Sequence, residues 1–331
     1  MNYNIPKVSI VTLTYKKFEK LLDTMSSVFA QDYNDIEYII CDDGSEIFPY
    51  DQVQCFIETN KRDNVSVKIL QNPENVGTVK NINRAYKEAA GKYIINLSCG
   101  DVFFTDIAVT QIVNRFEETN ANVLVTSRLF YENDFQPICF LPHYEERDIL
   151  KKLDTSLKQY KAFILSRFYD MASGSAMYFR NETIKNYNFF DERYRLWEDG
   201  PFLAKYLWND KLEMAYDIVS IWYEKGGMST NVNSPARIML LKDAAFFDRG
   251  EKLEHLNCFS NKEKRLIRNN SKRNIAKSQW GLWYLRFKYC PEIISTLMYV
   301  RQRNHFKKKD LTYIKELLEQ YKEHILPKKT K

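Results

Sequence analysis

GKYIINLSCGDVFF, residues 91–104, is a short apolar run that ends abruptly in small polar residues and one carboxylate, Asp101, before it becomes apolar again. A buried strand whose C-terminal edge opens into a polar loop has this pattern, and open α/β sheets bind ligands at such edges. Gly100 would let a ligand approach the backbone closely. On this local signal alone, an aspartate-capped turn into the next helix is the commoner structure.

The composition indicates a soluble globular protein with one large α/β domain and appendages, or with two small domains. The chain has 331 residues, of which 44% are hydrophobic and 28% charged. Six cysteines without a CxxC pair and four scattered histidines argue against a disulfide framework and against a zinc site. Because no apolar run approaches the roughly 18 residues of a spanning helix, we expect a cytoplasmic protein, with peripheral association at the inner face of the membrane as an option.

The charge is divided unevenly along the chain. Residues 1–234 carry 26 Lys and Arg against 33 Asp and Glu, whereas residues 235–331 carry 23 against 10. The basic tail could bind a membrane surface, or it could form a homo-oligomer through an aromatic seam, and these two uses stay open. The seam would consist of Trp280, Trp283, Leu285 and Phe287. No nucleic-acid-reading motif is recognisable, so we expect no nucleic-acid partner.

The first hundred residues alternate between strand and helix patterns. Strands are predicted at 8–13, 36–41 and 65–70, and helical stripes at 18–29, 53–59 and 79–89. Gly91 is predicted to be the glycine that ends the third helix, and the opening stretch supplies the fourth strand. This alternation favours a largely parallel sheet that is covered by helices on both faces.

Polar residues follow three of these strands at the point where each strand ends. They are Thr14-Tyr15, Asp42-Asp43 and Asp101. Because parallel strands point their C-terminal ends the same way, these residues should converge along one edge of the sheet. This convergence makes Asp101 more than an ordinary helix cap.

Beyond residue 105 the alternation loosens. A helix is predicted around 112–116, strands at 123–126, 173–179 and 216–222, a glycine-hinged loop at 223–229, and several short helices with a basic tail from about 236. Glu198 and Asp199 stand before Gly-Pro and a helical pattern that starts at Phe202. Taken alone, the two carboxylates could simply favour the positive end of that helix.

Two common nucleotide-binding signatures are missing from the sequence. No GxGxxG follows the first strand and no GxxxxGK[ST] occurs, which excludes the usual dinucleotide fold and the P-loop enzymes. A nucleotide could still be held through its base and ribose by Tyr15, Asp42 and Asp43. Its phosphates would then need a metal ion or a cationic side chain.

Six segments, in order and at similar spacing, resemble the inverting glycosyltransferases of family 2, which have the GT-A fold. The resemblance covers roughly residues 6–230. The segments are VSIVTLTYKKFEKLLDTMSSVFAQDY (8–33), IICDDGS (39–45), NPENVGTVKNINRAYKEAAGKYI (72–94), LSCGDVF (97–103), SGSAMYF (173–179) and WEDGPF (197–202). The expected fold is therefore a GT-A α/β fold with a mostly parallel central sheet, flanking helices and a C-terminal helical extension.

The resemblance implies a nucleotide-sugar donor, most often a UDP-sugar, that lies across the strand ends. Residues expected to bind the donor are Thr14, Tyr15, Asp42, Asp43, Lys80 and Gly100, with Lys80 at the diphosphate. Asp101 matches the last carboxylate of the DxD-type motif, which binds Mn²⁺ or Mg²⁺. Where the family often has several aspartates, this chain has Ser98-Cys99-Gly100-Asp101, and a lone carboxylate is sufficient in principle because such a cation also takes phosphate oxygens and water.

Glu198 and Asp199 match the family's ED motif, whose aspartate is the usual catalytic base. Trp197, Gly174 and Ser175 are expected near the acceptor, although core packing is an equally common role for Trp197. The chemistry needs these parts, because a cation stabilises the departing diphosphate and a carboxylate takes the proton of the attacking hydroxyl. Attack from the opposite face in one step would invert the anomeric configuration.

The sequence therefore predicts a metal-dependent hexosyltransferase that acts on a glycan, a glycoprotein or a lipid-linked saccharide. Residues 1–104 would bind the nucleotide sugar, residues 105–235 the acceptor, and residues 236–331 would form the basic helical extension. Two other functions stay open, a catalytically inactive sugar-nucleotide-binding or scaffold protein and a nucleotidyltransferase. The nucleotidyltransferase would normally show a glycine-rich phosphate loop after the first strand, and Thr12 to Tyr15 do not form one.

Overall fold

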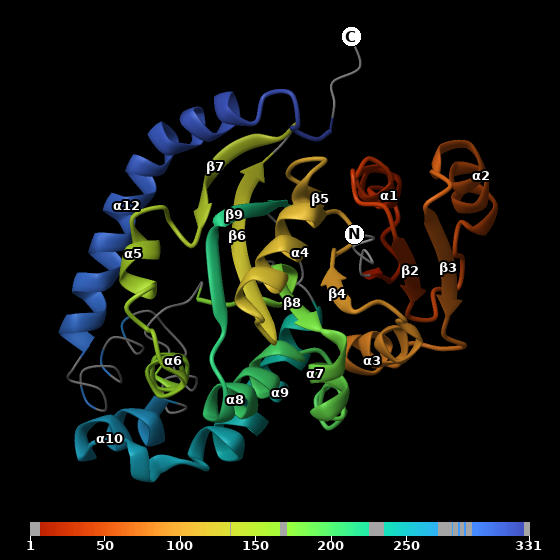
Figure 1. The fold of residues 1–331 in the computed structure, drawn as a ribbon. Coiled ribbons are helices and arrows are strands. Elements are labelled where there is room, and N and C mark those ends of the chain that lie inside the picture. Colours follow the sequence, from red (N-terminus) through yellow and green to blue (C-terminus); the bar gives the residue numbers. More distant parts are fainter. Residues whose placement is uncertain are drawn as a thin grey trace.

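The computed structural model describes residues 7–132, 134–165, 171–224, 235–270, 280, 284, 288 and 293–327. Its N-terminal half is a parallel sheet in the order β3-β2-β1-β4 (Figure 1). The strands are β1 (Val8–Thr14), β2 (Ile36–Asp42), β3 (Val65–Gln71) and β4 (Tyr93–Asn96). The helices between them are α1 (Leu21–Phe29), α2 (Tyr50–Asn60) and α3 (Thr78–Glu88). The predicted βα alternation is confirmed.

The second half continues the same sheet with mixed strand directions. Its strands are β5 (Val102–Phe103), β6 (Val123–Glu132), β7 (Gln136–Leu141), β8 (Met177–Arg180) and β9 (Glu213–Glu224). Strand β8 joins the halves because it runs antiparallel to both β4 and β6. Strand β9 runs parallel to β6, and β5 pairs antiparallel with β9 at the end of the sheet.

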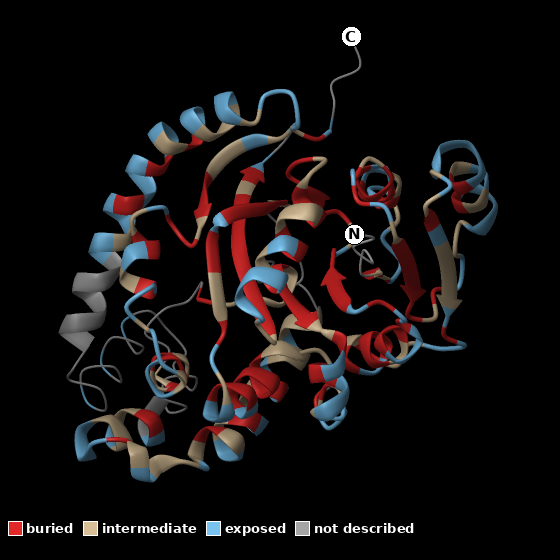
Figure 2. Cartoon of the chain, viewed as in Figure 1, coloured by how far each residue is buried: buried red, intermediate tan, exposed pale blue. Residues whose placement is uncertain are grey.

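Helices cover both faces of the sheet, as the alternation predicted. Side chains of β1 alternate between two apolar cores, with Val8 and Ile10 in one and Val11 in the other. The first core also holds α1, α2 and α4 (Ala108–Thr119). The second core holds α3, α6 (Ser156–Ile164) and α8 (Asp199–Asn209). Figure 2 shows the strands as mostly buried and the outer helices as exposed on one side.

The remaining elements are short, apart from those of the C-terminal part. They are α5 (Glu146–Leu150), α7 (Asn181–Asn186), α9 (Pro235–Arg249), α10 (Asn261–Asn270), α12 (Ile293–Gln320) and the 3-10 turns η1 (Gly174–Ala176), η2 (Glu251–Leu253) and η3 (Leu256–Cys258). The predicted helical extension is confirmed, but α12 is one 28-residue helix rather than several short ones. No helix in these ranges is both long enough and apolar enough to cross a membrane.

Two local predictions are wrong. The predicted strand 173–179 begins only at Met177, because Ser173 to Ala176 form a 3-10 turn in which the Ala176 N–H donates to the Ser173 carbonyl, 2.9 Å away. Gly91 does not end α3, which stops at Glu88. A Cβ on Gly91 would lie 2.4 Å from the backbone nitrogen of Ser9, so the glycine is needed for close packing against β1.

Two sequence interpretations fall mainly outside the described residues. The glycine-hinged loop at 223–229 is described only at Tyr223 and Glu224. Of the aromatic seam, only Trp280 is described, and its side chain is 87% exposed in the single chain. Homo-oligomerisation through this seam stays a prediction.

The C-terminal part closes the open end of the sheet. Helix α12 runs along the outside of β7 (Figure 1). After it, the Leu326 N–H donates to the Phe104 carbonyl at 3.0 Å, and the Asp106 N–H donates to the His324 carbonyl at 2.9 Å. The indole of Trp222 donates to the Leu326 carbonyl at 2.7 Å. Residues 324–326 therefore lie beside the segment that carries Asp101.

Candidate active site

The ends of β1 and β2 are joined by side chains, as the convergence argument predicted. The Thr14 hydroxyl donates to Asp42 Oδ1 at 2.9 Å, and these two residues are partners in the strand register. Asp42 is fully buried, and it also accepts the backbone N–H of Ser45 at 2.7 Å and the Ser45 hydroxyl at 2.8 Å. Tyr15, one residue further, is 42% exposed and offers its ring to solvent.

Asp43 organises the loop that leads into α3. Its carboxylate accepts the backbone N–H groups of Val76 at 2.9 Å and Gly77 at 3.0 Å. The side-chain amides of Asn72 and Asn75 donate to it at 3.2 and 2.8 Å. Gly77 has a φ of +92°, a backbone conformation that favours glycine. Lys80 follows on the exposed side of the first turn of α3.

Asp101 has a buried carboxylate, and one of its two oxygens makes no hydrogen bond to the described residues. The side chain is 5% exposed, and its Oδ2 has no hydrogen-bond partner in the described part of the chain. Burial raises the pKa of Asp101 to about 7, against the hydrogen bonds from the Glu224 backbone and from Ser98. An unpaired buried carboxylate oxygen is costly unless a proton or a cation binds it. Asp101 therefore fits a divalent cation that also takes oxygens from a ligand.

The backbone around Asp101 is fixed by α1. The Thr24 hydroxyl accepts the Gly100 N–H at 3.0 Å and donates to the Asp101 carbonyl at 2.9 Å. Gly100 has a φ of +101°, whereas a Cβ there would meet only Glu224 Oε2, at 3.7 Å. Backbone conformation rather than lack of space therefore requires this glycine.

The charge of Arg128 acts on both predicted chemical centres. This buried residue of β6 donates from Nη1 to the hydroxyls of Ser173 at 2.9 Å and Ser175 at 3.2 Å. Its charge acts on the carboxylates of both Asp101 and Asp199. Burial lowers the pKa of Arg128 from its ordinary value. Sequence reasoning missed this residue, although an arginine within the apolar run 123–131 was a usable signal.

The Glu198-Asp199 pair lies at the start of α8, beside η1. Asp199 Oδ2 accepts the Gly174 backbone N–H at 2.8 Å. A Cβ on Gly174 would lie 2.9 Å from Glu198 Oε1 and 3.4 Å from Asp199 Oδ2. Burial raises the pKa of both carboxylates, and the charge of Asp199 raises the pKa of Glu198 further. Gly174 and Ser175 therefore lie beside the base candidate and beside Arg128.

Trp197 packs within the fold. A Cβ on Gly200 would lie 2.2 Å from Trp197 Cε2, so the indole ring lies directly over this glycine. The ring also meets Phe247 of α9 edge-on, with 5.1 Å between centroids. These contacts match the core-packing role left open by the sequence.

A match to the model of glycosyl transferase family 2 spans residues 9–181. The chain belongs to glycosyl transferase family 2. The matched range contains Asp42, Asp43 and Asp101, and it ends before Glu198 and Asp199. The predicted family is thus confirmed on the half that carries the first carboxylates.

Two curated relatives of this family 2 chain match it over short ranges. An uncharacterized glycosyltransferase of Haemophilus influenzae is 26% identical over 99 residues, which is 30% of this chain and 29% of that protein. The Escherichia coli UDP-Glc:alpha-D-GlcNAc-diphosphoundecaprenol beta-1,3-glucosyltransferase WfaP is 31% identical over 128 residues, or 39% of this chain and 48% of that protein. The chain thus spans less than half the length of either relative.

Two solved structures resemble this family 2 chain over most of its length. Staphylococcus aureus TarS 1–349 in complex with UDP superposes with a TM-score of 0.52 at 15% identity, covering 94% of this chain and 92% of that one. The mannosyltransferase PcManGT of Pyrobaculum calidifontis, in complex with GDP-Man and Mn²⁺, gives 0.54 at 15% identity, covering 92% and 87%. At this identity the likeness shows the fold alone, and it confirms the predicted GT-A-like architecture.

Proposed function

We propose that this family 2 protein transfers a sugar from a nucleoside-diphosphate sugar to a hydroxyl group of a saccharide acceptor. The observation that carries the proposal is the Oδ2 of the buried Asp101, which has no hydrogen-bond partner among the described residues, while the charge of Arg128 acts on both Asp101 and Asp199. A UDP-sugar is the preferred donor, because WfaP is named for UDP-glucose and TarS was solved with UDP. The acceptor would be a glycan, a glycoprotein or a lipid-linked saccharide.

Asp101 is the residue that would hold Mn²⁺ or Mg²⁺ between the protein and the donor diphosphate. When bound, this cation supplies positive charge for the departing nucleoside diphosphate. The unpaired Oδ2 of Asp101 supports the assignment, and so does PcManGT, which was solved with Mn²⁺. Arg128 adds a fixed positive charge nearby, and because it is buried its field is only weakly screened.

The nucleotide would lie over the ends of β1 and β2. Tyr15 offers an exposed ring on which a base can stack, and Gly100 brings backbone close to the ligand. Thr14, Asp42 and Asp43 would shape the floor of this site, since their polar atoms already hold the surrounding loops. Lys80, exposed on the first turn of α3, would meet the diphosphate at the positive end of that helix.

Asp199 would act as the base that takes the proton of the attacking hydroxyl. The Gly174 N–H fixes one of its oxygens, and burial raises its pKa, which makes the carboxylate a stronger base. Glu198 and Ser175 would border the acceptor side, with Trp197 behind them. In this proposal residues 1–104 bind the donor and residues 105–235 bind the acceptor.

A donor panel tests the proposal. We expect the protein to release a nucleoside diphosphate from at least one nucleotide sugar in the presence of Mn²⁺. Asp199→Asn should lower turnover about 10²–10⁴-fold, because a positioned base contributes roughly this factor, while UDP affinity stays unchanged. Product release is measured by chromatography and UDP binding by calorimetry.

The matched control for this substitution is Asp63→Asn, exposed in the turn before β3 at the opposite edge of the sheet, which should keep full turnover. A wild-type protein that leaves every donor of the panel intact with Mn²⁺ present would contradict the transferase assignment. It would favour an inactive sugar-nucleotide-binding protein if UDP still bound.

A further inference from the structure

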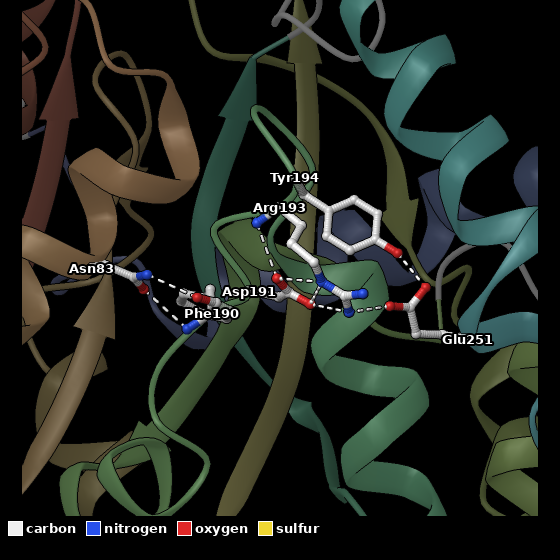
Figure 3. A network of polar contacts seen from close by, with 6 residues as sticks. All are labelled: Asn83, Phe190, Asp191, Arg193, Tyr194 and Glu251. Atoms are coloured by element: carbon white, nitrogen blue, oxygen red, sulfur yellow. Dashed lines mark hydrogen bonds and ion pairs between the residues drawn. The ribbon is translucent and has the colours of Figure 1, made fainter.

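The loop that precedes Glu198-Asp199 is held from two sides. On one side, the Asn83 side chain of α3 donates to the Phe190 carbonyl at 2.8 Å and accepts the Phe190 N–H at 2.9 Å. On the other side lies Glu251 of η2. Its carboxylate pairs with Arg193 at 2.6 Å and accepts the hydroxyl of Tyr194. Figure 3 shows this loop between Asn83 and Glu251.

The strongest anchor of the loop comes from α9, in the C-terminal extension. Asp243, which is 6% exposed, accepts the backbone N–H groups of three successive residues on one oxygen, Oδ2. The distances are 3.1 Å to Arg195, 2.7 Å to Leu196 and 3.1 Å to Trp197. The next two residues along the chain are Glu198 and Asp199.

A carboxylate in such a cradle fixes backbone direction. Successive N–H groups that converge on one anion form a concave site, and bonds to a charged acceptor are stronger than neutral ones. The apolar neighbours act in the same sense, because Phe246 meets Tyr194 at 5.2 Å and Phe247 meets Trp197 at 5.1 Å between ring centroids. Helix α9 therefore controls where α8 starts.

The same loop also touches the predicted donor side. The Arg195 carbonyl accepts the Val79 N–H of α3 at 3.2 Å, and the Arg195 guanidinium donates to Asn75 Oδ1 at 2.7 Å. Asn75 belongs to the loop that Asp43 organises. Contacts therefore run without a break from Asp43, through Arg195, to Asp243.

We propose that Asp243 is a positioning residue for the transfer reaction, through which the C-terminal extension sets the place of the catalytic base. This inference rests on the proposed function of Asp199. The alternative is a purely structural role, in which Asp243 only anchors the extension to the fold. In that case its removal would lower stability without a selective effect on turnover.

The test compares Asp243→Ala, Asp243→Asn and the control Lys242→Gln. Asn keeps a carbonyl oxygen that can accept the three N–H groups, whereas Ala removes the acceptor. Lys242 precedes Asp243 on the same helix and has an exposed side chain. Hydrogen exchange of the peptide containing 195–200 measures how well the loop amides are protected. The values of kcat, donor KM and UDP affinity measure the effect on the proposed active site.

With Asp243→Ala we expect faster exchange at 195–197, a kcat about 10–100-fold lower, and UDP affinity and donor KM within about threefold of wild type. Asp243→Asn should recover most of the kcat, and Lys242→Gln should resemble wild type. If Asp243→Ala opens the loop and kcat stays unchanged, or if the amides stay protected, the inference is overturned. An inactive wild-type protein would instead count against the proposed function, and the exchange data would still report whether Asp243 holds the loop.

Discussion

The side chain of Asp101 is buried, so its ionised form is poorly solvated. In the unfolded chain an aspartate has a pKa near 3.8, and burial raises the pKa of Asp101 to about 7 in the folded state. Between these values the folded protein binds more protons than the unfolded chain. The free energy of unfolding from this group therefore falls as the pH rises from about 4 to 7, and it stays reduced above that.

Asp101→Asn should therefore stabilise the metal-free protein at pH 8 and have little effect near pH 4, because the amide carries no buried charge. Each kcal/mol relieved would raise Tm by roughly 1–2 °C in a chain of this length. The same variant should lose Mn²⁺ binding, measured by the metal's spin-resonance signal in the presence of UDP. A Tm that is lower for the variant at pH 8 would contradict the unpaired state of this carboxylate.

The sequence identified candidate site residues best where they stand next to the end of a predicted strand or the start of a predicted helix. Asp101 was singled out because three strand ends are predicted to converge there, and Asp199 because WEDGPF resembles the family's ED motif. Their roles in the reaction stay predictions. Arg128 and Asp243 were not nominated, because their partners are far away along the chain. Asp243, for example, meets Trp197 from 46 residues further on. Such contacts follow from the packing of α9, which no local pattern encodes.

At the level of elements, the turn between β3 and α3 depends on one carboxylate. Asp43 holds the N–H groups of Val76 and Gly77, and it ties Asn72 and Asn75 to the end of β2. The start of α3, and with it Lys80, is fixed by this turn. The sequence suggested a ligand-binding role for Asp43, and the structure adds a second role, in holding the turn before α3.

Asp43→Ala should lower the free energy of unfolding by about 2–4 kcal/mol, because the buried Gly77 N–H and its neighbour at Val76 lose their acceptor. Urea unfolding measures the change, with the exposed Asp51→Ala of α2 as the control expected to lie within about 0.5 kcal/mol of wild type. A loss no larger than that of the control would show that the turn does not depend on Asp43.

Elements built from consecutive residues were predicted best. The strands β1, β2 and β3 lie within a residue of their predicted ends, because each is a β-branched run bounded by polar turns. Strand β8 was misplaced at its start, because Gly174 is held by the Asp199 carboxylate rather than by a neighbouring strand. The mixed directions of the second half could not be derived from local patterns, since strand partners there are chosen by long-range packing.

At the level of the whole molecule, the basic extension is part of the fold. Asp310 of α12 is fully buried, and it accepts the N–H groups of Phe140 and Tyr144, each at 2.9 Å, and pairs with His143 at 2.7 Å. Cys139 lies in the same cluster, within reach of a shared metal ion. Because Asp310 already accepts these N–H groups and burial raises the pKa of the Cys139 thiol to about 12, we interpret the cluster as a docking point for α12.

Asp310→Ala should loosen α12 from β7 and lower the free energy of unfolding by about 2–4 kcal/mol, because two backbone N–H groups lose their acceptor. Limited proteolysis within 293–320 should become faster, while Glu316→Ala, on the exposed side of α12, should leave the cleavage rate unchanged. Equal cleavage of both variants would mean that other contacts hold the helix.

Residues 324–326 cover the free side of the segment after β5, and the His324–Asp106 pair joins positions 218 residues apart in the chain. Strand β5 joins the sheet through β9, and a ribosome that adds 5–20 residues per second needs about five to twenty seconds from the end of β9 to His324. During that time the nascent protein exposes an open sheet edge at β5, next to Asp101. An unguarded strand edge is a template for pairing with other chains. The opportunity for misassembly of this protein is therefore set by the pace of translation between β9 and residues 324–326.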